Sequence, residues 1–417
     1  MTSPDTATVT TFGPAAEAER VDSIDVLRGF AVLGILVMNI QSYAMIGAAY
    51  LNPTAYGDLT GANYTVWLLS HVLADMKFMT LFSMLFGAGV ILFTARREAA
   101  TGKSAGLHYR RMAWLLLFGL MHAYLIWFGD ILYTYALCGM LVYLFRKRSP
   151  AVLLLVGLLV VGVGSATSLM AHWSMPQWPV ESIQELEQSW KPNAEAVAEE
   201  VAAYRGSWVE QMSHRAPAAF FFQTFLFAIE MAWRAGGLML VGMGLFKLGV
   251  FGAKRSTATY LVFVALAMLV GIPLVLYGVR RNEAHSWDLR SCFFFGSQFN
   301  YWGSLLVSLG WIGAIMLLCK HRLVRPLTGA LASVGRMAFT NYIMQSVLCT
   351  LIFYGHGLGY FGNVERTGQI AIVFAIFALQ LILSPIWLRA FRFGPLEWLW
   401  RSLTYWRLQP MRQRAGR

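Results

Sequence analysis

Long apolar runs without any charged residue constrain this chain more than any other feature. Residues 151–171 carry no Asp, Glu, Lys or Arg, and comparable runs recur along the sequence. A helix of about 20 apolar residues crosses the hydrocarbon core of a bilayer, whereas a water-soluble fold cannot bury several such segments. Charged residues make up 13% of the chain, about half of the share in an average soluble domain. The sequence therefore predicts an all-α, polytopic integral membrane protein built as a helical bundle.

Hydrophobic runs predict about ten transmembrane helices. In chain order they cover residues 26–44, 78–94, 112–128, 131–145, 151–171, 218–246, 259–277, 301–319, 331–353 and 370–388. Lys and Arg concentrate in alternate connections and in the segment after Leu388. Because basic loops face the cytoplasm in membrane proteins, both ends of the chain are expected there. One basic group, formed by Arg280, Arg281 and Arg290, does not follow this alternation.

The predicted organisation is one membrane domain with a tail at each end. It comprises a flexible cytoplasmic tail at residues 1–22, a five-helix half at 23–172, an acidic extracytoplasmic helical segment at 173–216, a second five-helix half at 217–390 and a basic amphipathic cytoplasmic tail at 391–417. In the last tail Leu396, Leu399 and Leu403 recur at helical spacing, and Glu397 and Arg401 are four residues apart on another face. This pattern predicts a helix that lies in the inner interface.

Charge and cysteine usage exclude several classes of protein. The net charge of +12 would suggest nucleic-acid binding in a soluble protein, but the basic residues lie beside hydrophobic segments, where membrane orientation explains them. No nucleic acid is therefore expected, and the lipid bilayer is the predicted partner. The four cysteines stand singly without a CxxC spacing, so we predict neither a metal site nor a redox centre. Any chemistry must come from dispersed residues that meet in the bundle.

Ionisable side chains inside the spans point to function, because each costs about 2.5–3.5 kcal/mol in hydrocarbon. On the first span Asp25, Arg28 and Asn39 fall on one face, since eleven residues at about 100° each return to within about 20° of the start. Arg28 can anchor the helix at its cytoplasmic end, with Asp25 in the first turn. Alternatively, the two residues contact a phosphate or carboxylate from the cytosol.

A histidine on the third span is the main catalytic candidate. His122 lies eleven residues beyond Arg111, about 16 Å along the axis, which places its imidazole near the bilayer midplane. Asp130 follows at the outer boundary. A lone histidine in a bundle is often only a hydrogen-bond partner for another helix. It is also the side chain best suited to proton transfer near neutral pH. Both interpretations are open.

A polar ledge is expected outside the second span. His71 and Asp75 are four residues apart, and Lys77 follows them. Asp130 is expected at a similar depth. These residues either line one outward-facing cavity or lie at the membrane interface without forming a common site.

Two further polar pairs repeat the i,i+4 spacing inside spans. Glu230 and Arg234 share one face of the sixth span, well inside the membrane, where they either form a structural ion pair or face a cavity. A buried pair seldom recovers its desolvation cost in full, which favours a wet or ligand-bearing cavity. Asn341 and Gln345 on the ninth span suit hydrogen bonds to a ligand or a neighbouring helix. Paired glycines are predicted to let helices pack closely: Gly87 and Gly89, Gly236 and Gly237, and Gly242 and Gly244.

Six strings carry a family resemblance. They are SIDVLRGFAVLGILVMNI from Ser23, KFMTLFSMLFGAG from Lys77, RRMAWLLLFGLMHAYLIWFGDILYTYALCG from Arg110, MAWRAGGLMLVGMGLFKLGVF from Met231, GRMAFTNYIMQS from Gly335 and FGPLEWLWRSLTYW from Phe393. Together they resemble the bacterial membrane family called domain-of-unknown-function 418, of the YeiB type. The resemblance runs nearly the whole chain and implies a multi-pass protein of the bacterial inner (plasma) membrane.

The DxLRG string of the first span is also similar to that of transmembrane acyltransferases. These include relatives of heparan glucosaminide acetyltransferase, which use cytosolic acyl-CoA to modify an acceptor on the far side of the membrane. The resemblance implies that Asp25 and Arg28 bind acyl-CoA at the cytosolic face and that His122 is catalytic. Acyl-CoA would then be a cosubstrate, and no permanently bound cofactor is expected.

The preferred hypothesis is acyl transfer across the membrane to an extracytoplasmic small molecule or glycan. His122 would take the acceptor's proton or carry the acyl group, and Asp130 or Glu230 would orient it. The residues expected to bind substrate are Asn39, His71, Asp75, Lys77, Arg234, Asn341 and Gln345. The hypothesis requires the charged side chains of the spans to meet around one water-filled chamber.

Two other functions fit the same residues. A small-molecule or proton-coupled transporter would use His122, Glu230 and Arg234 as a proton relay or substrate pathway. A nonenzymatic scaffold or sensor would not depend on these side chains.

Overall fold

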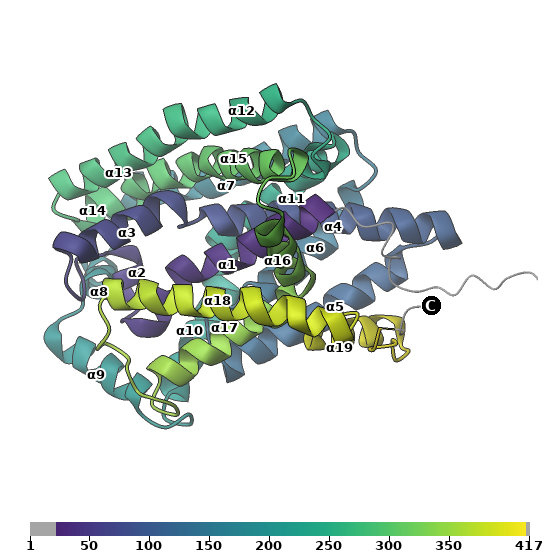
Figure 1. Ribbon diagram of the computed structural model, residues 1–417. Helices are drawn as coiled ribbons and strands as arrows, with labels where there is room; N and C mark the ends of the chain where they lie inside the picture. Colours follow the sequence, from purple (N-terminus) through teal and green to yellow (C-terminus); the bar gives the residue numbers. More distant parts are fainter. Residues whose placement is uncertain (1–21, 414–417) are drawn as a thin grey trace, which may run out of the picture.

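The computed structural model describes residues 22–413, and this part of the chain is built from helices. Within it, the single extended pairing is an isolated β-bridge between Phe391 and Arg412. The predicted tail at residues 1–22 lies outside the described residues except for Asp22, which begins the first helix. The long helices run side by side, and their connections gather at two opposite ends (Figure 1). The prediction of an all-α helical bundle is confirmed.

One set of helices forms the body of the bundle, and the others lie mainly at its ends. The body comprises α1 (Asp22–Ala44), α4 (Lys77–Thr101), α5 (Ala105–Leu125), α6 (Leu132–Val142), α7 (Pro150–Ser174), α11 (Ala232–Lys247), α12 (Thr257–Leu266), α13 (Ile272–Ala284), α15 (Ser297–Lys320), α17 (Ala338–Phe353) and α18 (Arg366–Ala390). The others are α2 (Ala48–Leu51), α3 (Gly61–Leu73), α8 (Val180–Trp190), α9 (Ala194–Arg205), α10 (Met212–Phe221), α14 (Leu289–Ser291), α16 (Arg325–Arg336) and α19 (Pro395–Tyr405). The π-helical segments Phe222–Met231, Ala267–Gly271 and Cys292–Gly296 join α10 to α11, α12 to α13 and α14 to α15.

The apolar helices agree with a polytopic membrane protein. Among the described residues, seven helical segments are long and apolar enough to cross a membrane, and two shorter apolar helices cover Leu132–Phe145 and Ala338–Phe353. Helix α5, whose first turns carry Arg110 and Arg111, packs along α6. Together these elements correspond to the ten predicted spans.

One predicted span is divided. Residues 331–353 were expected to form a single helix, but α16 ends at Arg336 and α17 begins at Ala338. Helix α16 is amphipathic and packs against α1, where Gly335 lies so close to the Asp25 carbonyl that a Cβ atom would overlap it. The prediction of one continuous helix is wrong because hydrophobicity does not reveal the change of direction at Met337.

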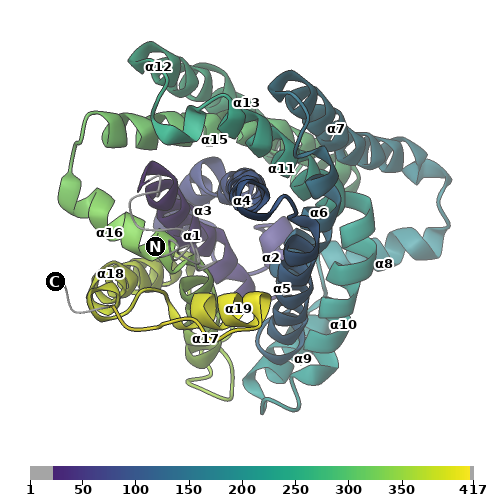
Figure 2. The same cartoon turned by 90° about the vertical axis from the view of Figure 1, so that its right-hand side faces the viewer.

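The basic connections meet at one end of the bundle, which faces the viewer in Figure 2. Lys247 Nζ donates to the Arg148 carbonyl at 2.6 Å, and Lys320 Nζ donates to the Arg255 carbonyl at 2.8 Å. The start of α1 and helix α19 lie at the same end (Figure 1). The positive-inside rule predicts that this basic end faces the cytoplasm.

The opposite end of the bundle carries the acidic segment at residues 173–216. It also carries Arg280, Arg281 and Arg290, the basic group that does not follow the alternation of basic connections. Helices α8 and α9 lie there (Figure 1), and Asn52 Nδ2 donates to the Trp190 carbonyl at 3.1 Å. The side chain of Arg280 pairs with Glu283 at 3.1 Å, and that of Arg290 lies 3.8 Å from Glu187. Both arginines therefore have carboxylate partners, which offset the positive charge expected to disfavour this end.

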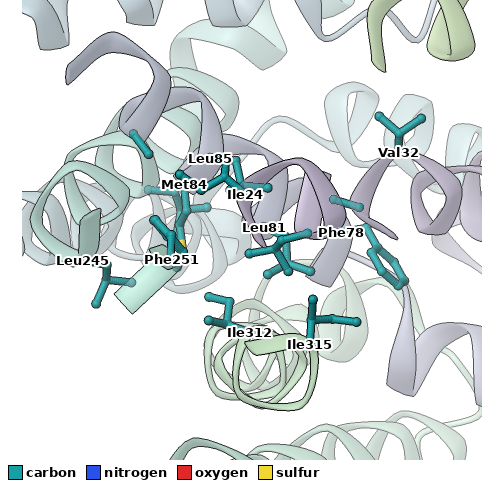
Figure 3. Packing of buried hydrophobic residues seen from close by; sticks show 14 of the residues in the cluster. Ile24, Val32, Phe78, Leu81, Met84, Leu85, Leu245, Phe251, Ile312 and Ile315 are labelled. Atoms are coloured by element: carbon teal, nitrogen blue, oxygen red, sulfur yellow. The ribbon is translucent and has the colours of Figure 1, made fainter. Parts of the chain in front are cut away.

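Helices α1 and α4 occupy the centre of the bundle, and others surround them (Figure 2). The spanning window of α1 is 67% buried within the protein, whereas that of α18 is only 22% buried. Figure 3 shows the central packing, in which Leu81 and Met84 of α4 lie near Ile312 of α15. The apolar outer faces suit contact with lipid, while the interior is packed by side chains.

Glycines also let α4 and α11 pack closely. Added Cβ atoms at Gly87 of α4 and Gly242 of α11 would overlap the carbonyls of Met239 and Met84, respectively. The prediction of close packing holds at these two positions. It fails at Gly89, where a Cβ atom would meet nothing within 4 Å. Gly87 and Gly89, two residues apart on α4, therefore face different surroundings: Gly87 contacts α11, and Gly89 faces open space.

We predict that Gly87→Val lowers the free energy of unfolding by about 1–3 kcal/mol, because overpacking must separate α4 from α11. Gly89→Ala on the same helix is the matched control and should not destabilise the protein. Thermal unfolding of both variants in detergent measures the difference. Wild-type stability of Gly87→Val would contradict the proposed backbone contact.

Candidate functional site

A cavity of about 370 Å³ begins at the basic end and extends into the bundle between α1, α4, α5, α6, α17 and α19. Six arginines and two carboxylates line it: Arg28, Arg96, Arg97, Arg111, Arg336, Arg401, Asp25 and Glu397. The inner part of the wall is apolar and aromatic and includes Ile131, Tyr135 and Tyr342. The cavity therefore combines a strongly cationic mouth with a largely apolar interior.

Helix α19 helps to position the arginines of the mouth. The guanidinium of Arg111 lies between the rings of Phe93 and Trp400, with its Cζ atom 4.7 Å and 4.4 Å from their centroids. Trp400 Nε1 also donates to the Arg111 carbonyl at 2.9 Å. Across the cavity, Arg28 Nη1 donates to Asp25 Oδ1 at 2.6 Å. The predicted tail helix is thus one wall of the cavity.

Glu397 fastens α19 to the start of α17. Its Oε1 atom accepts from the backbone N–H groups of Phe339 and Thr340 at 2.7 and 3.0 Å, and its Oε2 atom accepts from Thr340 Oγ1 at 2.6 Å. These donors belong to the first turn of α17, where a carboxylate satisfies free N–H groups and the helix dipole. Burial raises the pKa of Glu397, and the hydrogen bonds oppose that shift.

A chain of buried polar groups lies behind the inner end of the cavity. The ring of Tyr342 lines the inner end of the cavity, and its centroid is 5.2 Å from that of the His122 ring. His122 Nδ1 lies 2.8 Å from Asp130 Oδ2, and His122 Nε2 lies 2.9 Å from Ser346 Oγ. Tyr43 Oη in turn donates to Ser346 Oγ at 2.7 Å. A carboxylate, an imidazole and a hydroxyl in this order form a Ser-His-Asp arrangement.

Sequence reasoning had paired His122 with Asp130 or Glu230, and the geometry selects Asp130. The second Asp130 oxygen accepts from the Tyr133 backbone N–H at 2.8 Å, which fixes the carboxylate at the start of α6. Ser346 was missed, because a serine within a span ordinarily indicates close helix packing. Its position one turn after Tyr342 becomes informative only when α5 and α17 are seen together.

Glu230 and Arg234 do not form the structural ion pair that their spacing allows, although the two charges still attract each other. Arg234 instead donates to the Tyr301 carbonyl at 3.1 Å, to Thr80 Oγ1 at 3.2 Å and to Ser304 Oγ at 2.6 Å. Glu230 belongs to the π-helical segment, where hydrogen bonds run to the fifth residue and four residues no longer complete a turn. The prediction failed because it assumed α-helical geometry throughout.

The predicted ledge residues do meet, but at a buried site. Lys77 Nζ donates to Asn300 Oδ1 at 2.5 Å, and Asn300 Nδ2 donates to Asp75 Oδ2 at 2.8 Å. His71 Nδ1 lies 3.1 Å from the same carboxylate oxygen. The lysine is fully buried, not at an exposed edge. Asp130 does not belong to this site, because it contacts His122. Asn300 of α15 was not predicted, because nothing in sequence links it to α4.

The remaining candidates tie helices together or stand apart. Asn341 Nδ2 donates to Ser384 Oγ at 3.1 Å, and Gln345 Nε2 donates to Gln380 Oε1 at 2.9 Å, so both residues fasten α17 to α18. Asn39 is half-buried and makes no side-chain hydrogen bond with the described residues. None of these three lines the cavity. The expectation that all the charged residues share one chamber is wrong, so any transfer chemistry must rest on His122 and its hydrogen-bond partners, which adjoin the cavity through Tyr342.

We predict that Lys77→Met lowers the free energy of unfolding by about 3–5 kcal/mol, because it removes the cation that balances a buried carboxylate. The double variant Asp75→Asn, Lys77→Met should lose less than the sum of the two single losses. Lys103→Met, at an exposed lysine, is the control. Thermal or denaturant unfolding measures the four variants and the wild type, and strictly additive losses would contradict the coupling through Asn300.

Comparison with known proteins gives the family. Residues 245–407 match the family described as "Protein of unknown function (DUF418)". The chain is 31% identical to "Uncharacterized protein YeiB" of Escherichia coli (strain K12), over 93% of this chain and 96% of that protein. It is 32% identical to "Uncharacterized protein YxaH" of Bacillus subtilis (strain 168), over 96% of this chain and 98% of that protein. The predicted resemblance is confirmed, and the chain belongs to the domain-of-unknown-function 418 family of YeiB-type membrane proteins.

Proposed function

We propose that this protein transfers an acyl group from cytosolic acyl-CoA to an acceptor on the extracytoplasmic side of the plasma membrane. The observation that carries the proposal is the cavity, which joins a mouth of six arginines to an inner wall next to His122. Coenzyme A matches this polarity, because its phosphates lie at one end of a long arm and its thioester at the other. Arginine binds phosphate oxygens through paired N–H donors.

The depth of the site suits a donor with a flexible arm. Arg111 at the mouth and His122 are on the same helix, α5, and eleven residues of helix span about 16 Å. An inorganic phosphate held by the arginines would not reach the imidazole, whereas the arm of CoA extends from the phosphates into the bundle. The apolar side chains along the cavity accommodate an acyl group without hydrogen-bond partners of its own.

The chemistry follows from the partners of His122. Asp130 at Nδ1 orients the ring and stabilises its charged form, so Nε2 can accept a proton as a general base. His122 lies within one turn of the outer end of α5, and Trp208 of the acidic segment donates to the Leu125 carbonyl at 2.9 Å. An acceptor that enters beside that segment would approach the imidazole from the side opposite to the donor.

The test is calorimetric titration of the purified protein with acetyl-CoA. We expect binding to the wild type and at least about tenfold weaker binding to Arg28→Ala, because a charge-assisted hydrogen bond contributes about 1.5–3 kcal/mol. Arg280→Ala, at the opposite end, is the matched control and should bind as the wild type does. Absence of binding to the wild type would refute the proposal.

A second prediction concerns the cavity itself. Gly89 lines it, and a Cβ atom there would meet nothing within 4 Å, so Gly89→Leu should fill part of the space and weaken acetyl-CoA binding without lowering the unfolding temperature. Gly162→Leu, at an equally open position on α7, controls for the added side chain. Unchanged affinity in Gly89→Leu would mean that the donor binds elsewhere.

A transporter is the second candidate function. The observation that favours it is that the cavity ends at Tyr342 and does not include His122 among its lining residues, as expected for a carrier open to one side. Uptake of labelled solutes into proteoliposomes, with and without a pH gradient, distinguishes the two functions. A CoA-dependent modification without uptake favours the transferase.

A further inference from the structure

Ser346 occupies the position of a nucleophile. Its hydroxyl is fully buried between His122 of α5 and Tyr43 of α1, and Asp130 completes the chain. Three helices and the turn before α6 contribute one group each. Unless it is hydrogen-bonded or used in function, a polar group within a membrane bundle costs free energy. The arrangement brings a carboxylate, a base and a hydroxyl together next to an existing cavity.

The hydrogen bonds assign the protons. An ionised Asp130 can only accept, so the ring nitrogen Nδ1 of His122 carries its hydrogen, and Nε2 keeps its lone pair. Tyr43 donates to Ser346 Oγ, so the serine hydroxyl is free to donate to Nε2 at 2.9 Å. The bond to the Tyr342 carbonyl of its own helix is longer, at 3.4 Å. The serine is therefore directed at the base, as in an activated nucleophile.

Tyr342 connects this group to the cavity. It precedes Ser346 by one turn of α17 and lines the inner end of the cavity. Its hydroxyl is buried and donates to no group among the described residues, although the Ile131 backbone N–H approaches its oxygen. Buried hydroxyls are ordinarily satisfied, so this donor is available to a ligand. A carbonyl oxygen that becomes negatively charged during attack is a suitable acceptor.

We propose that Ser346 carries the acyl group as a covalent ester between donor and acceptor. This inference rests on the proposed function and replaces His122 as the acyl carrier. Ser346 Oγ attacks the thioester carbonyl carbon, and its proton passes to His122 Nε2. The carbon–sulfur bond then breaks, and the departing sulfur takes that proton, which yields free CoA and acyl-Ser346.

The second half regenerates the enzyme. An acceptor hydroxyl or amine gives its proton to His122 and attacks the ester carbonyl, and Ser346 leaves as a hydroxyl by recovering that proton. Neither half-reaction consumes an oxidant or a reductant, and neither needs a metal ion. CoA can return to the cytosol before the acceptor binds, so the site need not be open to both sides of the membrane at once. Tyr342 is the residue that must move to admit the donor.

The experiment incubates the purified full-length protein with acetyl-CoA without an acceptor. Peptide mass spectrometry should find one acetyl group on Ser346 in the wild type and in the control Ser333→Ala, and none in Ser346→Ala. The ester also predicts exchange of labelled CoA into acetyl-CoA without acceptor, which detects even a short-lived intermediate. Exchange should fall to background in Ser346→Ala and at least about a hundredfold in His122→Ala.

Calorimetric titration of the same variants with acetyl-CoA separates the possible failures. Ser346→Ala should bind within about threefold of the wild type, which shows that it folds. If the wild type binds acetyl-CoA but shows neither acetyl-Ser346 nor exchange, the covalent ester is refuted and direct transfer remains. If the wild type does not bind acetyl-CoA, the proposed function fails and this inference fails with it.

Discussion

The cost of a polar side chain in a membrane bundle is the constraint on which this structure depends. Two of the buried cations show how hydrogen bonds offset this cost. Arg234 is enclosed by two hydroxyls and a carbonyl, and Lys77 reaches Asp75 through the amide of Asn300. These groups hold helices together, and none of them lines the cavity. The group formed by His122, Asp130 and Ser346 differs because it adjoins a cavity through Tyr342, whose hydroxyl donates to no group among the described residues.

The same constraint makes the two ends of the bundle chemically different. Arginines gather at the end that the positive-inside rule assigns to the cytoplasm, and several of them line the cavity mouth. The histidine lies toward the other end of α5. Helix α19 couples the two regions, since Glu397 caps α17 and α17 carries both Tyr342 and Ser346. A donor bound at the mouth would therefore contact the element that presents the proposed nucleophile.

Sequence predicted the features that depend on composition and local periodicity. The apolar runs predicted the spans. The basic connections between them predicted which helix ends lie together at one end of the bundle. The spacing of Leu396, Leu399 and Leu403 gave the tail helix, although not its role as a cavity wall. The i,i+4 rule failed for Glu230 and Arg234 because a π-helical segment intervenes. Ser346 and Asn300 could not be predicted, because their significance depends on contacts with helices more than 200 residues away in sequence.

The most direct measurement of the central claim is an experimental structure with a nonhydrolysable thioether analogue of acetyl-CoA. The account predicts phosphates among the arginines of the basic mouth, the arm along the cavity, and the carbonyl of the analogue next to Tyr342 and Ser346. An analogue bound elsewhere, or a cavity that stays empty at saturating concentration, would contradict it.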